Sequence, residues 1–376
     1  MKEEETQQKL SENDDQEFGS ENINIGGEAL SNAFIKKKEK DQEEKDEENA
    51  KTPDLFQDNR EDTPKSIPWL TSRTDVSDPW TKLHNEMIEF YRIFGPSSER
   101  NLIRKNLFKK VKKFIKGVFP KAIIKMFGST AAMLYLPNSD IDVVVFLPEK
   151  SKNDLKNARK LHKLLSQISW ITSCECIPAK VPLVKMEDKD TGLSIDISFN
   201  KGNGVAALTF IKKYLLIYPE LKFLLLIIKA FLKARDLNET FHGGLSSFVC
   251  TLLIISYLQE AKKEEASENL LLSEHLLNFL HLYGVRFNYN EVGISIRNGG
   301  AYFLRELRGW QAINKSKSVT LCIENPQDPS VDLGKGVYNM PQVHTAFQHA
   351  YDTLRFNSSQ TESLLECIMG DISYLK

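Results

Sequence analysis

Three aspartates are the residues of this 376-residue chain whose types and spacing could do chemistry. Asp140 and Asp142 stand two residues apart in an apolar, β-branched run, so their side chains point to the same face of one strand. Asp196 lies in a second alternating run, between two isoleucines. Partly buried carboxylates that lie close together repel each other, and a divalent cation relieves that repulsion; ligands that are all oxygen suit Mg²⁺. The pattern therefore indicates a two-metal site for phosphoryl or nucleotidyl transfer.

A Gly-Ser pair, Gly128-Ser129, follows a strand predicted over residues 122–127 and is separated from Asp140 by ten residues. Glycine lets backbone N–H groups approach a phosphate closely, and the serine hydroxyl adds a donor. Each short pattern is common by itself, but a Gly-Ser turn and paired aspartates on consecutive strands form a specific combination. We expect the turn to bind phosphate beside the carboxylates.

The elements that must position these residues are a small sheet with helices, followed by a helical region. Alternating and β-branched runs predict strands over 122–127, 140–147, 170–177, 181–187 and 193–200. Helical periodicity predicts helices over 80–91, 102–118 (capped by Ser97 or Ser98), 153–168, 205–218, 220–235, 246–258, 270–283 and 341–356. Residues 325–336 read as a turn-rich segment. The order of elements predicts an α+β fold with a small mixed sheet and a mostly helical second domain.

The net charge of −1 conceals two different regions. Residues 1–60 carry 9 basic and 18 acidic side chains, and the remaining 41 basic and 33 acidic residues give the rest of the chain a charge of +8. The acidic region has few aromatic residues, so we expect a disordered tail. Its basic run at 36–40 has the composition of a nuclear import signal but is more typical of a solvated charged segment. The basic remainder favours a polyanionic partner.

The five cysteines form no disulfide or zinc framework. Cys174 and Cys176 have no second pair at zinc spacing, so reduced structural thiols are the better interpretation. No apolar leader and no apolar run of membrane-spanning length are present, and Lys222, Lys229 and Lys233 interrupt the most apolar segment. We therefore expect an intracellular protein without a membrane partner.

The motifs together resemble one enzyme superfamily. Gly128-Ser129, Asp140-x-Asp142 and Asp196 match the pattern of DNA polymerase β-like nucleotidyltransferases. Within that superfamily the chain is similar to the TRAMP-type nuclear poly(A) polymerases from about residue 67 to 355. The segments that carry this likeness are 67–70, 127–129, 134–142, 179–185, 196–199, 203–204, 228–238 and 243–245. The acidic tail lies outside the resemblance.

The resemblance implies a reaction and its metal ligands. Asp140 and Asp142 would hold two Mg²⁺ ions that bridge the nucleotide phosphates, with Mn²⁺ able to substitute. Asp196 would share the catalytic metal and help activate the RNA 3′-hydroxyl for in-line attack on the α-phosphate of ATP, with pyrophosphate leaving. The implied activity is that of a template-independent RNA 3′-adenylyltransferase, or poly(A) polymerase.

The resemblance also assigns nucleotide contacts. Lys229 and Lys233 stand four residues apart and so share one helix face, where they would neutralise the triphosphate; apart from the resemblance, solvent-seeking lysines on a buried helix explain them equally well. The other implied contacts are Gly128, Ser129, Asn203, Gly204, Ser247 and Phe248. Phe248 would stack on the base, and several relatives carry tyrosine there.

Residues 324–336 resemble the family's nucleotide recognition loop, in which Asp332 and Lys335 would lie near the base. Val331 occupies the position of a histidine in dedicated uridylyltransferases and of an asparagine in close poly(A) polymerases. Loss of the histidine argues against strict use of UTP, and loss of the asparagine weakens the selection of ATP. We expect ATP to be preferred.

Five segments are predicted: a charged tail (1–62), an N-terminal segment with a helix that packs on the central domain (63–97), the catalytic domain (98–200), the central domain (201–360) and a C-terminal tail (361–376). No RNA-binding module is recognisable, and the family commonly relies on a zinc-knuckle RNA-binding subunit and an RNA helicase in the nucleus, so the resemblance implies such partners. The alternatives are a terminal uridylyltransferase, a small-molecule nucleotidyltransferase and a catalytically silent RNA-binding scaffold.

Overall fold

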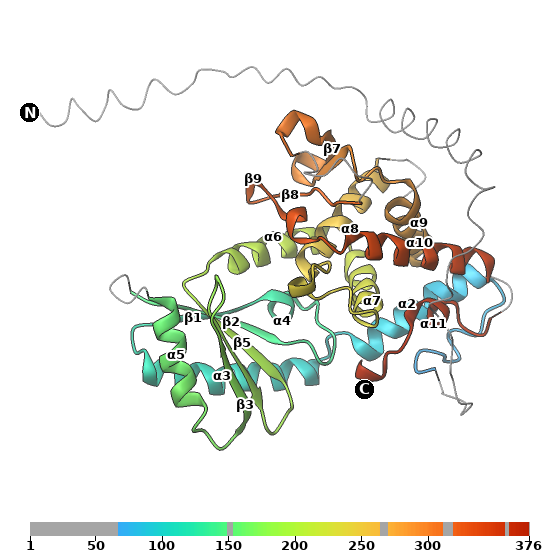
Figure 1. Ribbon diagram of the computed structural model, residues 1–376. Coiled ribbons are helices and arrows are strands. Elements are labelled where there is room, and N and C mark those ends of the chain that lie inside the picture. Colours follow the sequence, from blue (N-terminus) through green and yellow to red (C-terminus); the bar gives the residue numbers. More distant parts are fainter. Residues whose placement is uncertain (1–66, 149–152, 264–269, 311–318, 358–360, 376) are drawn as a thin grey trace, which may run out of the picture. The chain divides into compact units, whose positions relative to one another are not determined.

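The computed structural model describes residues 67–148, 153–263, 270–310, 319–357 and 361–375 (Figure 1). The predicted charged tail over residues 1–62 lies outside this range, as does its basic run at 36–40. The described chain has a mixed sheet with helices and a mostly helical region after it, so the predicted α+β fold class is confirmed.

The sheet has five strands in the order β1-β2-β5-β4-β3. The strands are β1 (Ile123–Phe127), β2 (Ile141–Phe146), β3 (Ile171–Ile177), β4 (Leu183–Asp188) and β5 (Ser194–Phe199). β2 and β5 run parallel, and the other neighbouring pairs are antiparallel. The five strands predicted from the sequence are present, each within two residues of its expected bounds.

Two helices, α3 (Ser98–Val118) and α5 (Asp154–Leu165), cover one face of this sheet. Their apolar residues share a core with the inward side chains of the strands. Ser97 and Asn153 cap the two helices through side-chain oxygens that accept backbone N–H groups. In β2, Ile141, Val143 and Val145 point into that core, so the alternation of the strand turns Asp142 to the opposite face.

The helical region consists of α2 (Pro79–Phe94), α6 (Asn203–Ile217), α7 (Leu221–Lys233), α8 (Ser247–Ala261), α9 (Leu272–His281), α10 (Met340–Phe356) and α11 (Leu364–Met369). α7 and α8 are the most buried of these helices and pack on each other. α2, although it precedes the sheet in the chain, packs on α7, α9 and α11. α6 contacts β1 at one side and α7 at the other, and so joins the sheet to the helical region (Figure 1).

Four features differ from the sequence-based expectation. Gly128-Ser129 is not an open turn but begins a short helix, α4 (Gly128–Ala132). The helix expected over 270–283 starts at Leu272 and finishes in a π-helical turn, Leu282–Arg286. The segment expected to be turn-rich is a hairpin of β8 (Glu324–Asn325) and β9 (Asp328–Asp332), followed by the 3₁₀ turn η7 (Leu333–Gly336). The hairpin of β6 (Val292–Ser295) and β7 (Ala301–Leu304) was not predicted, because these runs of four residues are too short for a period to show.

Candidate active site

The three aspartates lie together on the face of the sheet opposite its helical cover. The register of the parallel pair places Asp142 beside Asp196, and the register of β4 and β5 places Lys185 beside Asp196. Asp140 comes directly before β2. The Lys185 ammonium donates to Asp140 Oδ2 at 3.1 Å and lies 3.8 Å from Asp196 Oδ1. The sheet therefore carries a cluster of three carboxylates and one ammonium, which we call the carboxylate face.

Two aspartates of the carboxylate face have raised pKa values. Burial raises the pKa of Asp142 to about 7, with the charges of Asp196 and Asp140 adding to the rise and Lys229 and Lys185 opposing it. Burial likewise raises the pKa of Asp196 to about 6, against the effect of Lys185. Asp196 Oδ1 is buried and has no hydrogen-bond partner among the described residues. A buried carboxylate oxygen without a donor is expensive, so this oxygen is suited to accept a cation.

Gly128 brings the backbone of α4 onto the Asp142 carboxylate. Its φ of +66° lies in the left-handed region, and a Cβ atom at this position would stand 1.9 Å from Asp142 Oδ2. No side chain fits there, so glycine is required on both counts. The strand-to-helix junction thus presents Ser129 and the first turn of α4 beside the carboxylates.

Arg104 of α3 braces the segment that delivers Asp140. It is almost fully buried and donates to the carbonyls of Ser139 at 2.7 Å and Pro137 at 2.6 Å. Its guanidinium also lies 4.3 Å from the ring centroid of Tyr135. Charge-assisted bonds to two carbonyls of one loop fix the path of the chain just before Asp140.

A cavity of about 220 Å³ opens between the part of the carboxylate face with Asp140 and Asp142 and the helices α7 and α8, and Asp196 and Lys185 do not line it. It brings together six of the residues that the sequence analysis singled out: Ser129, Asp140, Asp142, Lys229, Lys233 and Ser247. It also contains polar residues that the sequence analysis missed: Asn138, Ser139, Asn238 and Glu239. The wall with Asp140 and Asp142 is acidic, while Lys229 and Lys233 make the opposite wall basic. Such a cavity matches a metal-bound polyphosphate in charge.

Lys229 and Lys233 share one face of α7, as their spacing predicts. The Lys229 ammonium donates to the carbonyl of Leu134 at 2.9 Å. Burial lowers the pKa of Lys229 to about 8, although Cys250 and Asp142 act in the other direction. An ammonium held at a cost in desolvation gains from an incoming anion. Ser247 lies at the start of α8, whose N-cap is Ser246, and its side chain is exposed to the cavity.

The other predicted nucleotide contacts do not line the cavity. Phe248 is half-buried in the first turn of α8, next to Ser247. Asn203 is exposed at the start of α6, and the backbone of Gly204 lies so close to Phe127 that a Cβ atom would stand 2.3 Å from its ring. Asn203 and Gly204 thus lie at the junction between β1 and α6.

In the predicted recognition loop, Asp332, which was expected to lie near the base, instead bonds to the backbone of the loop. Asp332 is buried, and its Oδ1 accepts the backbone N–H groups of Ile323 at 3.0 Å and Gly334 at 2.8 Å. Lys335 is exposed and Val331 is 39% exposed, and neither lines the cavity. The structure therefore gives Asp332 a supporting contact inside the loop, which the sequence analysis did not foresee.

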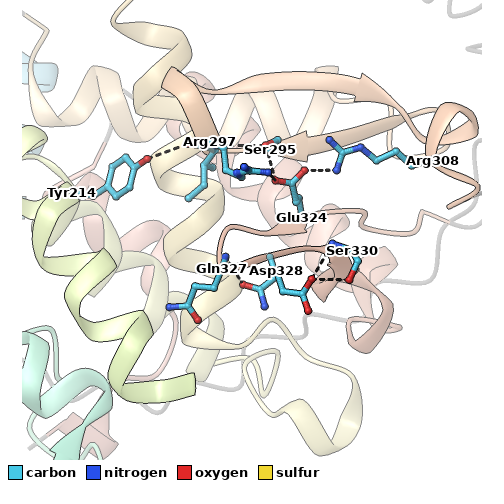
Figure 2. Close-up of polar contacts among 10 residues, drawn as sticks. Tyr214, Ser295, Arg297, Arg308, Glu324, Gln327, Asp328 and Ser330 are labelled. Carbon is cyan, nitrogen blue, oxygen red and sulfur yellow. Dashed lines mark hydrogen bonds and ion pairs between the residues drawn. The ribbon is translucent and has the colours of Figure 1, made fainter. Parts of the chain in front are cut away.

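A buried ionic cluster anchors the start of the loop. The side chain of Glu324, 1% exposed, accepts from Ser295 at 3.2 Å, lies 3.6 Å from Arg297 and forms an ion pair with Arg308. Figure 2 shows the two arginines on opposite sides of this carboxylate. The same figure shows Tyr214 of α6, which donates to the carbonyl of Ile296 at 3.0 Å. The sequence signal for this cluster is one acidic residue directly after the apolar run 321–323.

The donor types of the carboxylate face fit a divalent cation, but its present arrangement does not yet enclose one. Asp140, Asp142 and Asp196 supply oxygen ligands and unbalanced negative charge. Within the described ranges, however, no three His, Cys, Asp or Glu side chains converge closely enough to hold a metal ion as they stand. The Lys185 ammonium already lies against Asp140 and Asp196, on the oxygens that a metal would use. The residues fit the ion in kind and charge.

The comparisons with known proteins decide the family. Residues 83–215 match the family described as poly(A) RNA polymerase, mitochondrial-like, central palm domain, and residues 271–331 match the Cid1 family of poly A polymerases. The polymerase core of TRAMP, an RNA surveillance complex, superposes with a TM-score of 0.72 at 30% identity over 83% of this chain and 99% of that one. The chain belongs to the non-canonical poly(A) RNA polymerase family. Cid1 poly(U) polymerase, at 19% identity and a TM-score of 0.64, shares the fold.

Relatives within this family differ in length and in what their names say of activity. Poly(A) RNA polymerase CID14 of Cryptococcus neoformans is 36% identical over 301 residues, which cover 77% of this chain and 39% of the relative. Trf4-2 of Drosophila melanogaster, 32% identical and 72% covered, is named an inactive non-canonical poly(A) RNA polymerase. This chain therefore spans well under half of the length of CID14, and family membership alone does not establish catalysis.

No helix in the described part of the chain is long and apolar enough to cross a lipid bilayer.

Proposed function

We propose that this chain is a template-independent RNA 3′-terminal adenylyltransferase that adds AMP from ATP by two-metal catalysis. The observation that carries the proposal is the cavity in which Asp140 and Asp142 face Lys229, Lys233 and Ser247. An inactive relative exists in the family, so the presence of the three aspartates and of the lysines opposite them is what supports activity here.

Each residue has a role in this reaction. Asp140, Asp142 and Asp196 would hold divalent magnesium, or manganese in its place, which when bound would supply positive charge at the reacting phosphate. Asp196 would orient the RNA 3′-hydroxyl and accept its hydrogen bond. Lys229 and Lys233 would bind the β- and γ-phosphates, whose negative charge grows as pyrophosphate leaves.

The neutral groups complete the nucleotide site. Ser129, Ser247 and the backbone at Gly128 would donate hydrogen bonds to phosphate oxygens. Phe248 would stack on the base, and Asn203 and Gly204 would lie by the sugar at the junction of the sheet with α6. Lys335 would approach the base from the recognition loop, while Asp332 holds that loop in shape.

ATP is the proposed nucleotide, and UTP is the second candidate. Relatives named poly(A) RNA polymerases support ATP. The shared fold of a poly(U) polymerase and the absence of the family's asparagine at Val331 keep UTP in view. Extension of an oligo(A) primer with each of the four NTPs tests the choice: ATP should give the highest kcat/KM, and a higher value for UTP would replace adenylation by uridylation.

The proposed setting is nuclear RNA surveillance, processing and exosome-directed decay. It follows the likeness to the TRAMP polymerase core, with a zinc-knuckle RNA-binding subunit and an RNA helicase as partners. The proposed domain bounds remain 98–200 for the catalytic domain and 201–360 for the central domain. If the purified chain, even together with such partners, Mg²⁺ and ATP, extended no RNA 3′ end, the enzymatic proposal would be overturned.

A further inference from the structure

Lys185 occupies an unusual place for a strand lysine. β4 alternates so that Val184 and Met186 enter the core under the sheet, and this turns Lys185 to the carboxylate face. Its register partner on β5 is Asp196, whose own partner on β2 is Asp142. Lys185 is therefore one strand away from Asp196 and two strands away from Asp142. Backbone pairing between the strands, rather than a flexible loop, fixes this position.

The contacts of Lys185 resemble those expected of a bound cation. Its ammonium lies 3.1 Å from Asp140 Oδ2 and 3.8 Å from Asp196 Oδ1, and it joins a residue that precedes β2 to a residue in β5. Both of its ion-pair partners are acidic side chains of the carboxylate face. The lysine thus neutralises part of a cluster in which three acidic groups would otherwise repel one another.

From these contacts we infer that Lys185 is a positioning residue that serves as an internal counter-cation: it holds Asp140 and Asp196 together in the metal-free protein and competes with the divalent ion for them. The inference rests on the proposed two-metal function. Lys185 stabilises the carboxylate face when no metal is bound. It also lowers the affinity of that face for metal, since two positive charges that share the same oxygens repel each other.

The competing role is a purely structural one, in which Lys185 merely fills space in the sheet. That role predicts a loss of stability on substitution but no gain in metal affinity. The counter-cation role predicts opposite changes in the two quantities: lower stability without metal and tighter binding of metal. The sign of the change in metal affinity therefore separates the two roles.

The experiment measures Mn²⁺ binding by electron paramagnetic resonance, together with thermal unfolding in EDTA, for the full chain and three variants. Lys185→Met removes the charge and keeps much of the length, Lys185→Arg keeps the charge, and Lys125→Met removes an exposed lysine of β1 as the matched control. Lys185→Met should bind Mn²⁺ about tenfold more tightly, since one charge beside a divalent ion is removed at a solvated site. It should also unfold about 2–4 °C lower in EDTA.

The outcomes are distinct. Lys185→Arg and Lys125→Met should bind Mn²⁺ as the unchanged protein does, within about twofold, because both keep the positive charge at position 185. Unchanged or weaker Mn²⁺ binding by Lys185→Met would overturn the counter-cation role while leaving the proposed function intact. Absence of Mn²⁺ binding by both the unchanged protein and Lys185→Met would overturn the two-metal site itself, and the inference with it.

Discussion

The carboxylate face and the recognition loop are built on opposite principles. The carboxylate face takes its geometry from strand register, with Asp142, Asp196 and Lys185 on three adjacent strands of one sheet. The loop takes its geometry from side chains, since Glu324 anchors its start and Asp332 its end. In the proposed function, the chemistry lies on the sheet, and the choice of base would depend on a short hairpin that can change without disturbing the sheet.

A large effect on activity, second only to that of removing Asp140, should come from crowding the carboxylate face. In Gly128→Ala, the new Cβ atom would meet Asp142 Oδ2, and the left-handed backbone would be strained as well. We expect primer extension to fall by about 10²-fold, because displacing a reacting group by about 1 Å costs that much. Gly117→Ala in α3 has open space around its Cβ and is the matched control. Normal activity of Gly128→Ala would contradict the close approach of α4 to Asp142.

A smaller effect should follow from loosening the loop. Glu324→Gln keeps the shape but leaves Arg297 and Arg308 without their carboxylate. We expect a loss of about 1–2 kcal/mol in the free energy of unfolding, discounted because both arginines are partly exposed, and a rise in KM for ATP with little change in kcat. Glu306→Gln, on an exposed neighbouring turn, should change neither quantity. A fall in kcat alone would place Glu324 in the chemistry rather than in the support of the loop.

The pH dependence of stability should test the raised pKa values of the carboxylate face. Asp142 and Asp196 have folded-state pKa values raised to about 7 and about 6, from a usual value of 3.8. Between the usual and the raised pKa values, the folded state holds more protons than the unfolded state. The free energy of unfolding therefore falls as the pH rises from about 4 to 7. In EDTA, Asp142→Asn should remove part of this slope and be the more stable protein at pH 8, by about 1 kcal/mol. The free energy of unfolding is measured by denaturant titration at each pH. An equal dependence on pH in the two proteins would contradict the raised pKa of Asp142.

The smallest effect should come from changing the base preference. Val331 is partly exposed on β9, outside the cavity lined by Asp140 and Asp142. Val331→His should raise the ratio of UTP to ATP kcat/KM by about 5- to 10-fold, the effect of one hydrogen bond or less. Primer extension with competing nucleotides measures that ratio. A loss of all extension would show that the hairpin supports catalysis directly.

The sequence predicted the sheet better than the loop, for physical reasons. Asp142 and Asp196 were recognisable because a period of two in an apolar run fixes which side chains share a face. Lys185 was missed although it lies in a predicted strand, since its partner Asp140 is 45 residues away in the sequence and one strand alone does not show which others lie beside it. The supporting contacts of Glu324 and Asp332 were not predicted, because their partners depend on where loops meet. The helix period predicted that Lys229 and Lys233 share one face. Their place in the site also depends on the position of α7 over the sheet.

The carboxylate face is the proposed catalytic centre. The most direct measurement is extension of a 5′-labelled oligo(A) primer with ATP and Mg²⁺ by the unchanged chain, by Asp140→Ala and by Asp190→Ala. Asp190 is 74% exposed and lies between β4 and β5 near Lys110, so its loss controls for removing an acid from the same domain. We predict a fall of at least about 10³-fold for Asp140→Ala, with folding intact, since metal ligands supply several kcal/mol at the transition state. No change is expected for Asp190→Ala. Undiminished extension by Asp140→Ala would contradict the assignment of the site.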